Sequence, residues 1–341
     1  MQRITHMKFE HVLRSNQFHL GTLEYLFALA DKIRKFNRTQ EGLLYLRSLL
    51  PHKRAMLFFS QPSTRTFLSF QAACQILGIQ TSAIRDPATS SEKKGESIED
   101  SLRTFSSYVD LIIMRSPVAG LCEKIAVLLD NTKSWVPIIN AGSGPDEHPT
   151  QALLDLYTLN RGFKLHGGIN GKTICMVGDL KRGRTVRSLS QLLAHYKGVK
   201  IIFSSPQEFK IEPDLRAHLQ QAGNINFVET TDFVNSISSA DAIYMTRIQD
   251  EYDSPDNSLQ NIDTSQYNLT YEHLAILKPS CKILHPMPRR QELDIKIDQD
   301  PRAEYWNQQR NGMWIRAAVI AVLLGVDQEI LSHTVTAHHA L

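Results

Sequence analysis

The sequence predicts an α/β protein with two doubly wound parallel-sheet domains of similar size, joined by interdomain helices. Short apolar runs alternate with segments of helical periodicity along the chain, which is typical of parallel sheets covered by helices. The chain has 341 residues, which suffices for two domains at roughly 100–200 residues each. Its 42% hydrophobic and 21% charged residues are an ordinary globular balance, so extensive disorder is excluded.

The first half of the chain opens with a helix and continues through three strand-like runs. Leu20–Phe36 carries apolar residues at helical spacing. A second helix is predicted from about Phe67 to Gly78, and a third begins near Pro149, a residue suited to a first helical turn. The runs that predict buried strands are Ala55–Phe59, Val109–Met114 and Val136–Asn140.

The second half repeats this alternation. We place the domain boundary at the helix near Pro149: residues 1–150 form one domain and 151–302 the other. A C-terminal helix of about 303–335, with its clearest periodicity over Met313–Leu324, is expected to pack back on the first domain. A helix is also predicted over Ser188–Tyr196, and the strand-like runs are Thr173–Val177, Lys200–Phe203, Ala242–Met245 and Lys282–Leu284.

Charge and cysteine usage exclude several classes of partner. With 38 basic and 35 acidic residues the net charge is only +3, so we expect no nucleic-acid partner. The four cysteines form no C-x-x-C pair, which argues against a zinc site or disulfide framework and for reduced thiols in the cytoplasm. The longest apolar run, Ala317–Gly325, is far short of the ~20 residues that span a bilayer, and the N-terminus lacks a signal-peptide pattern. We therefore expect no membrane association.

The predicted strand ends carry groups that bind anions, and ligands of parallel sheets lie at these ends. Ser63-Thr64-Arg65-Thr66 begins a helix, whose free N–H groups and dipole favour phosphate; the hydroxyls and guanidinium add donors. N-capping alone is the structural alternative. Arg115 and His148 also follow strands, although for each residue taken alone a surface ion pair or a satisfied loop histidine is the better explanation.

Other candidate sites are weaker. The Gly178–Arg184 turn follows a strand, but its two glycines do not fit the dinucleotide fingerprint. The polar segment around Lys94 predicts either a solvated loop or one that closes on an anionic ligand. The strand ends carry no paired carboxylates and no Cys/His cluster, so no metal or organic cofactor is expected.

Taken together and in this order, several segments resemble the aspartate/ornithine carbamoyltransferase family from about Phe18 to Gly325. They are FFSQPSTRTFLSF, MRSP, HPTQALLDL, VGDLKRGRTVRSL, YMTRIQDE, HPMPR and NGMWIRAAV. The second half favours the aspartate branch, because an ornithine enzyme is expected to carry HCLP in place of HPMP. The resemblance implies transfer of the carbamoyl group of carbamoyl phosphate to the amine of L-aspartate. The products are N-carbamoyl-L-aspartate and phosphate, an early step of de novo pyrimidine biosynthesis.

The resemblance also implies roles for individual residues. Arg184 is expected to bind the α-carboxylate of aspartate and Arg247 the β-carboxylate, with Gln249 nearby. Ser90 and Lys94 would enter the site of an adjacent subunit, which implies a homotrimer; a regulatory or dihydroorotase partner stays open. Lys94 would also contact aspartate and, with Arg65, Thr66, Arg115 and His148, form the catalytic set. Carbamoyl phosphate would be bound by Ser63, Thr64, Arg65, Thr66, Arg115, His148, Gln151, Met287 and Pro288.

Some positions depart from the family pattern. Ser60-Gln61-Pro62 precedes STRT where the family has an acidic residue and one residue fewer, and Phe67 and Tyr252 stand at usual arginine positions. Closure and cooperativity are therefore left open, and the tail Val326–Leu341 has no assigned role. Two alternatives remain: a transcarbamoylase for another amino acid, or a non-catalytic subunit. The latter would be expected to have lost Arg65, Lys94 or His148, and the chain retains all three.

Overall fold

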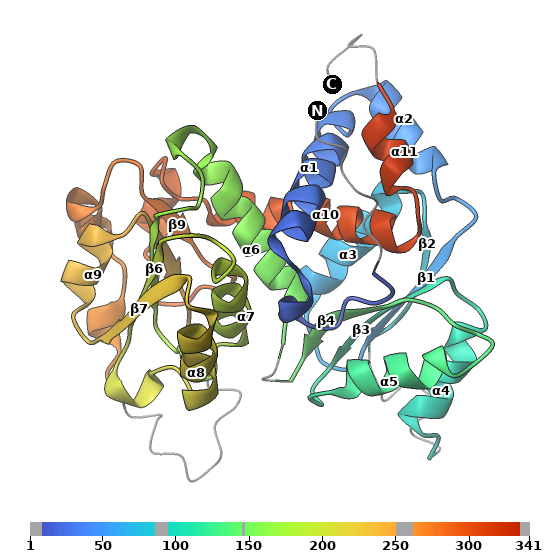
Figure 1. The fold of residues 1–341 in the computed structure, drawn as a ribbon, viewed down its shortest axis with the longest axis horizontal. Helices are drawn as coiled ribbons and strands as arrows, with labels where there is room; N and C mark the ends of the chain where they lie inside the picture. Colours follow the sequence, from blue (N-terminus) through green and yellow to red (C-terminus); the bar gives the residue numbers. More distant parts are fainter. Residues whose placement is uncertain (1–8, 86–94, 145–146, 250–261, 335–341) are drawn as a thin grey trace. The chain divides into compact units, whose positions relative to one another are not determined.

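The computed structural model describes residues 9–85, 95–144, 147–249 and 262–334. The chain forms two compact units (Figure 1). Unit 1 takes the chain up to Thr150 and again from Gly312, and unit 2 is Gln151–Asn311. Both contain a parallel sheet with helices, so the predicted fold class is confirmed.

The C-terminal return to unit 1 differs in detail from the expectation. It occurs at Gly312, inside α10 (Tyr305–Leu323), and not at about residue 303. The segment forms two helices, because Gly325 adopts a φ of +74° and ends the first before α11 (Asp327–Ser332) begins. The second half of α10 packs on unit 1 through Arg316, whose guanidinium lies 4.8 Å from the ring centroid of Phe70.

Unit 1 contains a four-stranded parallel sheet in the order β2-β1-β3-β4. The central strands β1 (Arg54–Phe59) and β3 (Leu111–Ser116) are almost entirely buried, as expected of strands covered on both faces. The N-terminal segment pairs with β4 (Ile138–Ser143) at the edge of the sheet, where the Val12 amide donates to the Ile138 carbonyl at 2.8 Å. β2 (Gln80–Ile84) is the opposite edge.

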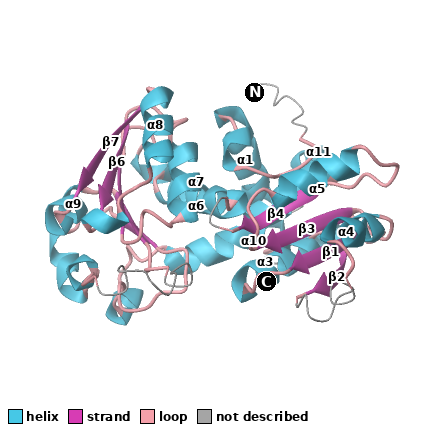
Figure 2. Cartoon of the chain, turned by 90° about the horizontal axis from the view of Figure 1, so that it is seen from below, coloured by secondary structure: helices cyan, strands magenta, loops and turns pink. Residues whose placement is uncertain are grey.

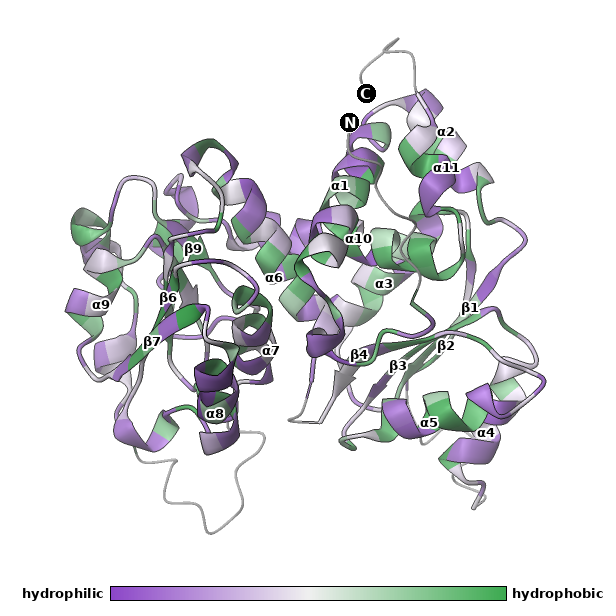
Figure 3. Ribbon diagram, in the orientation of Figure 1, coloured by the Kyte–Doolittle hydropathy of each residue, from purple (hydrophilic) through white to green (hydrophobic). Residues whose placement is uncertain are grey.

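Different helices cover the two faces of this sheet (Figure 2). α4 (Ile98–Ser106) and α5 (Leu121–Asp130) pack on the face that carries Met56, Phe58, Ile112 and Met114. Hydrophilic and hydrophobic residues alternate along α5, which leaves one side of the helix for the core (Figure 3). On the other face, Phe59 meets Phe67 of α3 (Thr64–Ile76) with ring centroids 5.4 Å apart.

The C-terminal tail has a structural role. α11 packs on α1 (Leu20–Phe36), where the Tyr25 hydroxyl donates to Asp327 and accepts from Gln328 at 2.8 Å. His333 stacks on Tyr45 of α2 (Gln40–Ser48) with ring centroids 3.6 Å apart. The described part of this tail therefore completes the helical layer of unit 1.

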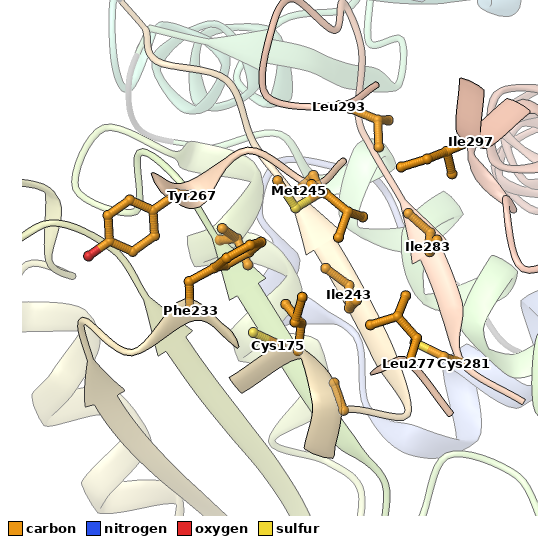
Figure 4. Packing of buried hydrophobic residues seen from close by; sticks show 14 of the residues in the cluster. Cys175, Phe233, Ile243, Met245, Tyr267, Leu277, Cys281, Ile283, Leu293 and Ile297 are labelled. Atoms are coloured by element: carbon orange, nitrogen blue, oxygen red, sulfur yellow. The ribbon is translucent and has the colours of Figure 1, made fainter. Parts of the chain in front are cut away.

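Unit 2 contains a five-stranded parallel sheet in the order β7-β6-β5-β8-β9. One face packs on α9 (Phe233–Ser239) and on the segment around Tyr267, forming the core drawn in Figure 4. The other helices are α6 (Pro149–Gly162), α7 (Arg184–Leu193) and α8 (Pro213–Ala222). The strands are β5 (Thr173–Val177), β6 (Val199–Ser204), β7 (Ile225–Thr230), β8 (Ala242–Met245) and β9 (Lys282–Leu284).

The edge strands β2 and β7 were not predicted. Both mix polar with apolar residues, and only Ile225 among their side chains is buried, so neither forms the continuous apolar run that marks a buried strand. The central strands β5 and β8 match the predicted ranges residue for residue. Among the described helices, none is long and apolar enough to cross a bilayer.

Candidate active site

The start of α3 carries the residues that the sequence predicted to bind phosphate in unit 1. Ser63 precedes the helix in an extended conformation (φ −164°, ψ 95°), and its side chain makes no capping hydrogen bond. The capping alternative is therefore not realised. Thr64 and Arg65 are exposed, whereas Thr66 is buried against the sheet. The first turn can thus offer hydroxyls, a guanidinium and backbone N–H groups to an anion.

Arg115 is the penultimate residue of β3 and pairs with Phe59, the last residue of β1. Its carbonyl accepts from the Ser60 amide at 2.9 Å and from the Ser60 hydroxyl at 3.2 Å, which ties it to the loop that leads into α3. The side chain is only 6% exposed, and Nη1 donates to the Ala141 carbonyl at 3.1 Å. Arg115 is therefore not the surface ion pair that its sequence context allowed.

Gly142 lies where Arg115 and His148 converge. Its φ is +119°, and a Cβ placed there would lie 2.5 Å from Arg115 Nη1 and 3.5 Å from His148 Cδ2. Only glycine fits this position without displacing the guanidinium. The close approach brings a buried cation and a buried imidazole to one point at the carboxyl edge of the unit 1 sheet.

A buried carboxylate holds the segment that carries His148. Glu147 is 3% exposed and accepts from the Ser15 hydroxyl at 2.9 Å, while its carbonyl accepts from the Ser143 amide at 3.0 Å. The N-terminal segment of the chain thus anchors the residue that precedes His148. This anchoring fixes the histidine at the start of α6.

In unit 2, Asp179 connects the two loops that carry the predicted carboxylate-binding residues. Its fully buried carboxylate accepts from Arg182 Nε at 2.7 Å and from the Gln249 amide at 3.1 Å. Arg184 begins α7 five residues after Asp179, and Arg247 lies two residues before Gln249. One side chain therefore joins the ends of β5 and β8 at the carboxyl edge of the sheet.

The arginines of these two loops are half-buried. Arg247 Nη1 donates to the Ile248 carbonyl at 2.8 Å. A cavity of about 430 Å³ opens at the same strand ends, lined in part by Gly178, Thr246 and Ile248. Neither Arg184 nor Arg247 is among its lining residues, which include Arg290 but also Asp263 and Glu292.

The HPMP segment is held by the buried His285. The Met287 amide donates to His285 Nδ1 at 2.7 Å, so Nε2 carries the hydrogen and donates to Glu292 at 2.8 Å. Burial lowers the pKa of His285, which keeps the imidazole neutral at pH 7. Met287 adopts a φ of 60° and is followed by a cis bond to Pro288.

Two family models match nearly the whole chain. Residues 10–161 match the carbamoyl-P binding domain of aspartate/ornithine carbamoyltransferases, and residues 170–323 match their Asp/Orn binding domain. The chain belongs to the aspartate/ornithine carbamoyltransferase family. The STRT, Arg115 and His148 positions lie in the first matched domain, and Arg184 and Arg247 lie in the second.

Individual members of the family resemble the chain over most of its length. It is 40% identical over 315 residues to the aspartate carbamoyltransferase catalytic subunit of Clostridium novyi, covering 91% of this chain and 96% of that protein. It is 38% identical to the chloroplastic aspartate carbamoyltransferase of Arabidopsis thaliana, covering 92% and 77%. A structure of aspartate transcarbamoylase from Trypanosoma cruzi with carbamoyl phosphate and aspartate is 31% identical, with a TM-score of 0.84 and coverage of 93% and 97%.

The departure from the family pattern at Phe67 can be located in the structure. Phe67 is buried between Phe59 and the Arg85 guanidinium, which lies 4.5 Å from its ring centroid, so an arginine still stands beside this position. Ser90, Lys94 and Tyr252 lie outside the described residues. Among those described, no group of three or more His, Cys, Asp or Glu side chains is arranged to hold a metal ion.

The sequence analysis assigned no role to three buried carboxylates next to the predicted ligand residues. Glu147 precedes His148, Asp179 precedes the Arg184 turn, and Asp155 lies four residues after Gln151. Each stands inside or beside a motif used for the resemblance. The i,i+4 spacing of Gln151 and Asp155 on a helix was the one available signal.

Proposed function

We propose that the chain transfers the carbamoyl group of carbamoyl phosphate to the amine of L-aspartate. The observation that carries this proposal is the meeting of buried Arg115 and His148 at Gly142, together with a first turn of α3 that Ser63 does not cap. These groups lie in the domain that matches the family's carbamoyl-P binding domain. Relatives that are aspartate carbamoyltransferases, and the Trypanosoma cruzi complex with carbamoyl phosphate and aspartate, support the same substrates here.

The geometry suits the charge that develops during this reaction. The amine attacks the carbamoyl carbon, a C–N bond forms, and the negative charge moves to the carbonyl oxygen. The C–O bond to phosphate then breaks, and the amine proton goes to the departing phosphate. Thr66, Arg115 and His148 are proposed to donate to the carbonyl oxygen, where removing one preorganised donor typically costs about 10²–10³ in kcat.

The second substrate is proposed to bind in unit 2. Aspartate carries two carboxylates, and Arg184 and Arg247 provide two guanidinium groups from loops joined by Asp179. Ornithine has one carboxylate and a cationic side chain, which the second arginine would repel. The chain therefore favours aspartate by attraction and disfavours ornithine by charge.

A carbamoyl-transfer assay tests the proposal directly. Purified chain is supplied with carbamoyl phosphate and either L-aspartate or L-ornithine, and both phosphate and the carbamoylated product are measured. Turnover with aspartate alone is expected. Turnover with ornithine, or with neither acceptor in a folded protein, contradicts the proposal; in the latter case profiling of other amino acids separates a different acceptor from a non-catalytic subunit.

A matched pair of arginines on α7 sharpens the assay. Arg184→Ala should raise the KM for aspartate about 100-fold or more, because it removes a charged hydrogen bond to the substrate. Arg187 lies one turn further on and is paired with Asp214 of α8 at 3.2 Å, so Arg187→Ala should leave the KM within twofold. Equal effects of the two changes would show that α7 acts only through overall charge.

We also propose a homotrimer that acts in pyrimidine biosynthesis, with Ser90 and Lys94 serving a neighbouring subunit. Mixing Lys94→Ala chains with Arg65→Ala chains tests this sharing. Hybrids should regain activity that neither parent has, because some sites combine two intact contributions. Hybrids that assemble and remain inactive would refute shared sites.

A further inference from the structure

Asp155 is a fully buried carboxylate at the centre of a hydrogen-bonded network in unit 2. It lies on α6, one turn after Gln151. Its Oδ1 accepts from Gln151 Nε2 at 2.9 Å and from Gln308 Nε2 at 2.6 Å. Its Oδ2 accepts from the Tyr244 hydroxyl at 2.6 Å. Residues from α6, β8 and α10 thus meet at one carboxylate.

This network determines which end of the Gln151 amide faces away from Asp155. Carboxylate oxygens accept hydrogen bonds, so the NH₂ end of Gln151 must point to Asp155 and Oε1 must point elsewhere. The Gln308 amide is oriented in the same way from its other end, because its Oε1 accepts from the His285 amide at 2.8 Å. Gln308 therefore cannot turn over to offer Asp155 an acceptor.

Tyr244 is also a hydrogen-bond donor, to the other carboxylate oxygen of Asp155. Burial, with the Asp155 charge as a further cause, raises the pKa of the Tyr244 phenol well above its ordinary value, so it remains a neutral donor. The phenol also interacts with Thr185, the neighbour of Arg184. The carboxylate is thereby fixed by three donors from separate elements.

We propose that Asp155 is a positioning residue that presents Gln151 Oε1 as the acceptor for the carbamoyl NH₂ group. The network would thereby make the protein select carbamoyl phosphate over an acyl phosphate with a methyl group in that place. This inference rests on the proposed function. A methyl group offers no hydrogen to Oε1 and would leave a buried acceptor unpaired, which is the kind of mismatch that gives strong discrimination.

The test compares equilibrium binding of carbamoyl phosphate and acetyl phosphate by calorimetry, without aspartate. Asp155→Leu should weaken the binding of carbamoyl phosphate about 2- to 13-fold, the size expected for one net hydrogen bond, and the binding of acetyl phosphate less than about twofold. Asp155→Asn keeps an oxygen that can accept from Gln151 and Gln308. It should therefore preserve the wild-type preference for carbamoyl phosphate over acetyl phosphate. In a Gln151→Met background, Asp155→Leu should change the preference by less than about twofold, since the oriented acceptor is already gone.

Thr158→Val provides a matched control on the same helix. Thr158 lies one turn beyond Asp155, is equally enclosed, and accepts from Asn311 of α10 at 3.0 Å. Loss of the Thr158 hydroxyl should lower the free energy of unfolding without changing the preference between carbamoyl phosphate and acetyl phosphate. If Asp155→Leu does not fold, Gln308→Leu, which removes one of the two amides on Oδ1, should reduce the preference in the same direction.

The outcomes separate the inference from the proposed function. The positioning role is overturned if Asp155→Leu lowers the affinity for both ligands equally. It is also overturned if Thr158→Val changes the preference between the ligands, or if Asp155→Leu lowers that preference further in the Gln151→Met background. A wild-type chain that does not bind carbamoyl phosphate overturns the proposed function itself. A loss confined to carbamoyl phosphate that Asp155→Asn does not show supports the inference.

Discussion

The effect of Gly142→Ala is the one that follows most directly from the structure. An added Cβ would lie 2.5 Å from Arg115 Nη1, whereas ordinary contacts begin at 3.4 Å, so the guanidinium must retreat by close to 1 Å. That movement breaks its hydrogen bond to the Ala141 carbonyl. A displacement of this size at a reacting centre can cost about 10²-fold in rate. The backbone φ of +119° adds strain of about 1–3 kcal/mol.

Steady-state kinetics and urea unfolding separate the two effects. We expect Gly142→Ala to lower kcat about 100-fold and the free energy of unfolding by about 1–3 kcal/mol. Gly120→Ala is the control: φ there is +73° and nothing lies within 4 Å of the added Cβ. It should lose stability and keep kcat. A Gly142→Ala protein with kcat within threefold of Gly120→Ala would refute the convergence of Arg115 and His148 as the basis of activity.

Three further predictions follow from other contacts. His148→Ala should lower kcat about 10²–10³-fold, and an unchanged kcat would remove His148 from the proposed donor set. Asp179→Ala should raise the KM for aspartate about 10- to 100-fold, because Arg182 and the Gln249 amide lose their acceptor; the Kd for carbamoyl phosphate should stay within twofold, and equal changes would contradict a local role. Burial lowers the pKa of His285 below 6.5, so the unfolded chain binds the proton more readily and stability falls as pH drops below 6.5. Urea unfolding should show this slope, at most about 1.4 kcal/mol per pH unit, in the wild type and not in His285→Gln.

The motifs indicated which residues to examine but not how they are held. STRT and HPTQ predicted a helix start and a histidine before a helix, and the structure has both. The roles of these residues in binding and catalysis stay predictions. The sequence did not reveal that Glu147 is anchored by Ser15, because those residues are 132 positions apart. Contacts at that separation leave no periodic pattern.

The sequence by itself determined the alternation of strands and helices, the parallel sheets and the membership of the family. These properties depend on local periodicity and on short motifs, which neighbouring residues encode. Tertiary structure alone decided the edge strands β2 and β7, the docking of α11, the convergence at Gly142 and the network around Asp155. Tyr244 and Gln308 reach Asp155 across 89 and 153 positions of the chain, so only the folded backbone brings these donors to one carboxylate.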